Sequence, residues 1–178
     1  MGGAEMFTEL IPDQDTLHLH GSPDATAPVS FHGMLSEAQK IVRKHYPGAR
    51  FLEADIDYET FGSGWRFVFD VPATSLKEAQ STVILYNVMG QFQMPLQLVE
   101  APWSGDQPIP LPLPVIVEEA EELAQHASNN GVVTSASLRW VLFPGIEEPH
   151  YILTVPDRDL QVFVGAYSRQ VRAISLTV

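Results

Sequence analysis

The sequence predicts an α+β fold of two similar modules, in each of which one helix packs on an antiparallel β-sheet of three or four strands. Three observations favour this fold. A helical stripe of apolar residues is followed by several strand-like segments, the same order returns after a proline-rich segment, and apolar positions align between the two stretches with gaps only in turns. A repeated order of this kind indicates that one packing arrangement occurs twice.

Composition favours a folded, acidic protein. Hydrophobic residues make up 45% of the chain and charged residues 18%, which is ample material for a core. The formal net charge of -12 argues against nucleic acid and anionic lipid as partners, because phosphate groups are bound by Lys and Arg. A cationic partner fits better. The absence of cysteine excludes a disulfide framework, a Cys-ligated zinc site and a thiol nucleophile.

Residues 1–32 are predicted to form an extended arm, because Pro12, Gly21, Pro23 and Pro28 interrupt them and only the stretch 16–20 alternates like an edge strand. No basic stretch followed by an apolar run opens the sequence, so no signal peptide is expected. No apolar run approaches the roughly 20 residues that span a bilayer, so no transmembrane segment is expected either.

The first module is predicted over residues 33–99. Apolar residues recur at steps of three and four from Leu35 to His45, which indicates a helix that Pro47-Gly48 ends. Four segments that alternate, or are rich in aromatic and β-branched residues, are expected to be strands. They cover residues 51–58, 65–71, 82–88 and 92–99.

Residues 100–116 are predicted to be a linker. Alternating prolines favour polyproline II geometry and cannot donate to a β-ladder, so the segment is expected to be semi-rigid. The alternative is an edge segment that lies against one module.

The second module is predicted over residues 117–178. A helical stripe runs from Val117 to Ala127 and Asn129-Asn130-Gly131 ends it; strands follow over 132–141, 150–155, 160–164 and 171–178. The alignment places the residues of the first helix and first strand 82 positions before their counterparts, and it assigns a two-residue insertion to the turn that follows that strand.

Both halves contain a helix of the Ser-Glu-Ala-x-x-Ile-Val kind and a late strand pair, joined in the first half through a Gly90 turn. The stretches that carry this pattern are Leu35–Val42, Pro47–Ala49, Tyr86–Phe92, Glu118–Ala124 and Ala166–Val171. The pattern resembles PepSY-like domains, which have the wider cystatin-like arrangement of a helix across a curved sheet. The resemblance implies a domain that binds or inhibits rather than catalyses, located outside the cytoplasm or at the envelope. If Met1 is the native start, a cytoplasmic location is expected instead.

The candidate ligand-binding residues are four carboxylates at every second position of the first predicted strand, Glu53, Asp55, Asp57 and Glu59. Side chains alternate along a strand, so all four are expected on one face at spacings of roughly 6.5–7 Å, with Leu52 and Ala54 on the other face. Such a row suits a cationic peptide or a divalent ion, and the alternative is a solvated strand face. The second half has no acids at these positions, so the fold does not require them.

The candidate metal ligands are His18 and His20, which share a face if residues 16–20 form a strand, although no third ligand is fixed by the sequence. No Gly-x-Ser-x-Gly motif, no Gly-rich phosphate loop and no Ser-His-acid grouping is present. No catalytic residue, no enzymatic activity and no cofactor is therefore expected.

The leading functional hypothesis is a non-catalytic binding or inhibitory module that recognises a protein or peptide, with a cationic one favoured. The first alternative is a metal-handling protein that uses the acidic strand or the histidine pair. The second is a hydrolase whose site has no recognisable motif, and the third is a fragment of a larger envelope protein. The ligand and the oligomeric state do not follow from the sequence.

Overall fold

A computed structural model describes residues 30–58, 64–73, 80–103, 107–142 and 146–176. The fold is α+β, with two helices and one large antiparallel sheet of nine strands. The helices are α1 (Phe31–His45) and α2 (Val117–Ala127), and Pro156–Arg158 form one short 3₁₀ turn. The strands are β1 (Arg50–Asp57), β2 (Trp65–Val71), β3 (Ser81–Val88), β4 (Gln91–Phe92), β5 (Gln97–Val99), β6 (Ser135–Trp140), β7 (Pro149–Val155), β8 (Leu160–Gly165) and β9 (Val171–Ser175).

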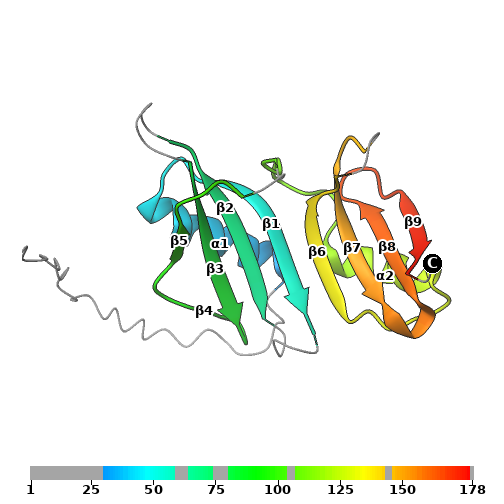
Figure 1. Ribbon diagram of the computed structural model, residues 1–178. Coiled ribbons are helices and arrows are strands. Elements are labelled where there is room, and N and C mark those ends of the chain that lie inside the picture. Colours follow the sequence, from blue (N-terminus) through cyan, green and yellow to red (C-terminus); the bar gives the residue numbers. More distant parts are fainter. Residues whose placement is uncertain (1–29, 59–63, 74–79, 104–106, 143–145, 177–178) are drawn as a thin grey trace, which may run out of the picture.

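The sheet has the strand order β4-β3-β2-β1-β6-β7-β8-β9, and β5 also pairs with β3. Each half of the chain thus contributes a helix followed by an antiparallel meander, and the two meanders meet where β1 pairs with β6. Both helices lie on the same side of the sheet, and among the described residues no helix covers its other, helix-free side (Figure 1). Neither helix in the described part of the chain is long and apolar enough to cross a membrane.

α1 forms because its apolar residues fall on one face and its ends are capped. Phe31, Leu35, Ala38 and Val42 are all buried at three- and four-residue steps. The side chain of Ser30 accepts a hydrogen bond from the backbone N–H of Gly33, which satisfies one of the free donors at the helix start. The helix therefore begins at Phe31, inside the predicted arm of residues 1–32, and earlier than the apolar periodicity indicates.

The bounds of α2 are as predicted, and its C-terminal side explains why. Ser128 donates its hydroxyl to the carbonyl of Ala124, and Asn129 and Asn130 adopt left-handed backbone conformations with φ of 55° and 61°. The chain then passes through Gly131, where a Cβ would lie 2.3 Å from the side chain of Val155. Only glycine fits this close approach between the end of α2 and β7.

Two predicted strands differ in detail from the observed ones. The alternation in β1 is interrupted by a bulge at Leu52, because Phe51 pairs with Phe69 whereas Glu53 pairs with Val68. Leu52 is buried but lies outside the main core cluster. The predicted strand 92–99 is split into β4 and β5, with a cis Met94-Pro95 peptide bond between them.

The proline-rich segment is built into the core rather than exposed between two bodies. Ile109, Leu113 and Val115 are buried in the same hydrophobic cluster as residues of both halves. The backbone N–H of Ile109 donates to Phe51 in β1, and that of Val115 donates to Ala166 just after β8. The segment therefore fastens the two halves together on the helix side of the sheet.

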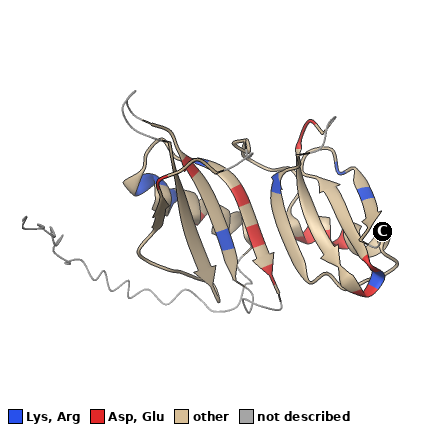
Figure 2. Ribbon diagram, in the orientation of Figure 1, with Lys and Arg blue, Asp and Glu red and all other residues tan. Residues whose placement is uncertain are grey.

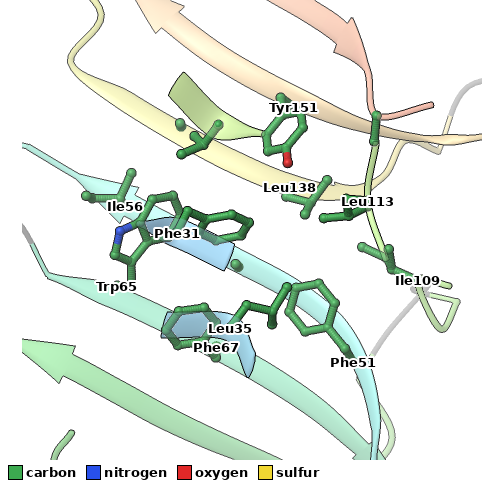
Figure 3. Close-up of a cluster of buried hydrophobic side chains, with 14 of the residues drawn as sticks. Phe31, Leu35, Phe51, Ile56, Trp65, Phe67, Ile109, Leu113, Leu138 and Tyr151 are labelled. Carbon is green, nitrogen blue, oxygen red and sulfur yellow. The ribbon is translucent and has the colours of Figure 1, made fainter. Parts of the chain in front are cut away.

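The core is one continuous cluster that crosses the junction between the halves (Figure 3). Phe31 of α1 is 4.6 Å from Trp65 of β2 and 6.5 Å from Tyr151 of β7, measured between ring centroids. The hydroxyl of Tyr151 donates to the backbone carbonyl of Val115 at 2.8 Å, so its buried polar group is satisfied. Aromatic packing around Phe31 thus joins the first half to the second.

Candidate functional site

A pocket of about 410 Å³ lies over the helix-free side of the sheet, across the junction of the two halves. Residues from β1, β2, β3, β6, β7 and β8 line it. The side chains that alternate toward this side are Asp55, Asp57, Arg66, Tyr86, Val88, Ser135, Ser137, Ile152, Thr154 and Gln161. The pocket is therefore formed by the sheet itself, with polar groups in most of its lining positions.

The register of the strands arranges these side chains in two rows that run across the sheet. One row contains Tyr86, Arg66, Asp55, Ser137 and Ile152, each opposite the next on a neighbouring strand. The other contains Asp57, Ser135, Thr154 and Gln161. Residues directly opposite each other in a sheet are about 4.5–5.5 Å apart, so each row presents a line of closely spaced hydrogen-bonding groups.

Glu53 lies beside the pocket and is fully buried, which its position in the acidic row did not indicate. Its carboxylate accepts from Arg66 at 2.7 Å, from the indole N–H of Trp103 at 3.2 Å, and lies 3.3 Å from Arg139. Trp103 also stacks against Arg66, with 5.5 Å between the guanidinium carbon and the ring centroid. Buried charge is tolerated here because two arginines and a ring N–H share it.

Asp55 is the acid that connects this cluster to the pocket. It accepts two hydrogen bonds from Arg66, at 2.9 and 2.5 Å, and lies opposite Ser137 in the register. Burial, followed by the neighbouring charge of Glu53, raises the pKa of Asp55 to about 6, although Arg66 acts in the opposite direction. The carboxyl group of Asp55 therefore changes charge at a pH at which an aspartate in water is already ionised.

This shift predicts how stability depends on pH. Because the folded-state pKa of Asp55 lies above the unfolded value of 3.8, the folded protein holds this proton more tightly. The stabilisation of the folded state by this proton is fully present below about pH 4, and it is lost as the pH rises through about 6. Asparagine cannot titrate. We therefore expect the free energy of unfolding of the Asp55→Asn variant to rise by about 1–2 kcal/mol, relative to that of the unmodified protein, as the pH is raised between these two values. Urea unfolding of both proteins at each pH measures the difference; a constant difference would contradict the shift.

The predicted acidic row is therefore neutralised over part of its length. Figure 2 shows the acidic positions of β1 between an arginine on β2 and one on β6. Asp57 lies at the end of β1 in the lining of the pocket. Glu59, His18 and His20 lie outside the described residues. Among the residues that are described, no three His, Asp or Glu side chains come close enough to hold a metal ion.

The sequence did not indicate that Arg66, Arg139 and Trp103 contact the acidic row, although the two arginines neutralise part of its charge and Trp103 donates a hydrogen bond to Glu53. Arg66 and Trp103 come from segments that appear in sequence as an aromatic strand and a linker. The alternation of Arg66 with Trp65 and Phe67 does place its side chain on the face opposite the core. The sequence therefore indicates the face on which Arg66 lies. It does not indicate the strand pairing that brings Arg66 beside Asp55.

Comparison with known proteins identifies the fold alone. No family model matches the chain, and no curated protein matches it. A crystal structure of a protein from Clostridium difficile 630, provisionally described as a lipoprotein, is similar with a TM-score of 0.54 over 79% of this chain and 91% of that chain. The two sequences are 11% identical, so the similarity shows a shared arrangement of helices and sheet.

Proposed function

We propose that this protein is a non-catalytic binding module that recognises an extended segment of a protein or peptide on the helix-free side of its sheet. The observation that carries the proposal is the pocket of about 410 Å³ at the junction of the halves. Binding pockets are concave and combine apolar surface with a few converging polar groups, and this pocket has Ile152 and Val88 beside carboxylates and hydroxyls.

The chemistry of the lining favours a ligand that donates hydrogen bonds. Asp57 offers a carboxylate, Asp55 offers one whose Oδ2 already accepts from Arg66, and Ser135, Ser137 and Thr154 offer hydroxyls that both accept and donate. Arg66, the one arginine among the described lining residues, is engaged by Glu53 and Asp55. A lysine or arginine side chain of the partner is therefore better matched to this pocket than an acidic one, and the net charge of -12 attracts such a partner at long range.

A peptide titration tests the proposal. The probe is a synthetic peptide of about ten residues with alternating lysine and threonine, long enough in extended form to cross the six lining strands. We expect amide chemical shifts to change along β1, β6 and β7. Filling the pocket with Ser137→Trp, or removing one charge with Asp57→Asn, is expected to weaken binding by about ten-fold or more.

The matched control is Glu122→Gln, which removes the same charge from an exposed position on α2, away from the pocket. It is expected to change the affinity by less than about two-fold. Equal effects of Asp57→Asn and Glu122→Gln would show that the peptide follows the overall charge, and the proposal would fail. Cleavage of the peptide during the titration would replace binding by a hydrolytic function.

We further propose that the two halves are copies of one helix-plus-sheet unit, of the PepSY-like kind that the sequence resembles. Support comes from the register. Asp55 pairs with Arg66, and the residues 84 positions later, Arg139 and His150, pair with each other. If a two-fold axis relates the halves, one residue of β1 must pair with its own counterpart in β6. Ala54 pairs with Leu138, which is again 84 positions later, so this requirement is met. The sequence alignment assigned the two-residue insertion to the turn after the first strand. With an offset of 84 for that strand, the insertion lies instead between α2 and β6.

A further inference from the structure

β9 forms one end of the sheet, and its outer edge has no strand beside it among the described residues. The opposite end differs, because β4 and β5 both pair with the outer edge of β3. All five residues of β9 are exposed, and the strand contains no proline, no bulge and one charge, Arg172. Prolines, bulges and charged side chains usually protect an edge strand from pairing with another chain. A regular, nearly uncharged edge is therefore suited to pairing with another strand.

The hydrogen bonds at the two ends of β9 show which backbone groups point outward. Gly165 donates to Gln170 at one end, and Leu176 donates to Asp159 at the other. Bonded and non-bonded pairs alternate in an antiparallel ladder, so Arg172 and Ile174 bond to β8. The intervening residues Val171 and Ala173 therefore direct their N–H and C=O groups away from β8, toward the open edge.

The edge is complementary to itself. When two β9 strands lie antiparallel with Ala173 opposite the same residue of a second copy, the outward-facing groups meet in hydrogen-bonding register. In that register Arg172 of one copy lies opposite Ile174 of the other, so the single charge of the strand does not meet a like charge. The chain already joins its own halves by antiparallel pairing of β1 with β6, so a second junction of the same kind extends an existing arrangement.

We propose that β9 pairs with β9 of a second copy of this chain, across a two-fold axis at Ala173, to give a dimer with one continuous sheet. The interface is isologous, since the same five residues meet from both sides. It lies at the end of the sheet, on the edge of β9 that faces away from β8, the last strand that lines the pocket. The dimer is tested without any peptide, so its failure and the failure of the proposed function are distinguishable.

Sedimentation equilibrium of the full chain at concentrations up to about 200 µM tests the dimer. The decisive variant is Ala173→Pro, which removes an outward N–H and leaves the bonds to β8 intact. We expect its dimer dissociation constant to rise by about 30-fold or more, with an unchanged circular dichroism spectrum. Ala173→Thr keeps the N–H and is expected to dimerise like the unmodified protein.

Arg172→Pro completes the set, because it removes a hydrogen bond to β8 and is expected to destabilise the monomer instead. An unmodified protein that remains monomeric over the whole concentration range would overturn the proposal. A dimer that Ala173→Pro does not weaken would also overturn it, because the interface would then lie elsewhere on the surface.

Discussion

Replacing Phe31 by alanine is expected to lower the free energy of unfolding by about 3–5 kcal/mol, the range found when a fully buried phenylalanine is truncated. Phe31 is 1% exposed and packs against Trp65, Phe67 and Tyr151. The loss combines the transfer free energy of the ring with the cavity that remains. Urea unfolding followed by circular dichroism measures it.

The same variant tests whether the halves share one core. Because the ring of Phe31 contacts β2 of the first half and β7 of the second, amide hydrogen exchange is expected to accelerate in both strands together. Met89→Ala is the control, since Met89 is 81% exposed and its truncation should change stability by less than about 0.5 kcal/mol. Faster exchange confined to β2 would mean that the halves are stabilised separately.

Replacing Glu53 by glutamine is expected to lower the free energy of unfolding by about 2–4 kcal/mol. The carboxylate is fully buried, and its removal leaves the positive charges of Arg66 and Arg139 without the group that they share. The two arginine side chains remain about one third exposed and keep some contact with water, which places the loss below that of a wholly buried ion pair. Urea unfolding at neutral pH measures it.

Glu37→Gln is the matched control for this variant. It breaks the ion pair between Glu37 and Lys40, in which both side chains are more than half exposed, and should change stability by less than about 0.5 kcal/mol. If Glu53→Gln were as mild as Glu37→Gln, the buried carboxylate would not be holding β1, β2 and β6 together. Trp103 offers a second readout, because its indole N–H donates to Glu53 and its fluorescence should change in the variant.

The elements that the sequence predicted well are those with strong local signals. α2 has the predicted bounds, since its apolar stripe is regular and two asparagines and a glycine follow it. β2 also has the predicted bounds, because an aromatic and β-branched run lies between glycine-containing and proline-containing segments. The start of α1 was predicted too late, because the cap at Ser30 precedes Gly33, a residue that weakens the helical pattern.

The candidate site was predicted only in part. Alternation along β1 placed Asp55 and Asp57 on one face, and both line the pocket. Glu53 belongs to the same face but is buried and paired, because Trp103 reaches it from a segment 50 residues away along the chain. Such a contact depends on how distant segments cross, and no spacing within the strand reports it.

By itself, the sequence predicted both helices and most of the strands, and it predicted which side of β2 and of each helix faces the core. These properties follow from local periodicity, because burial acts on every turn of a helix and every second residue of a strand. Only the tertiary structure decided that β1 pairs with β6 in one sheet, that Glu53 is buried between two arginines, and that a pocket opens at the junction. Those features are contacts between residues far apart in the chain, and their energies depend on a register that local patterns do not specify.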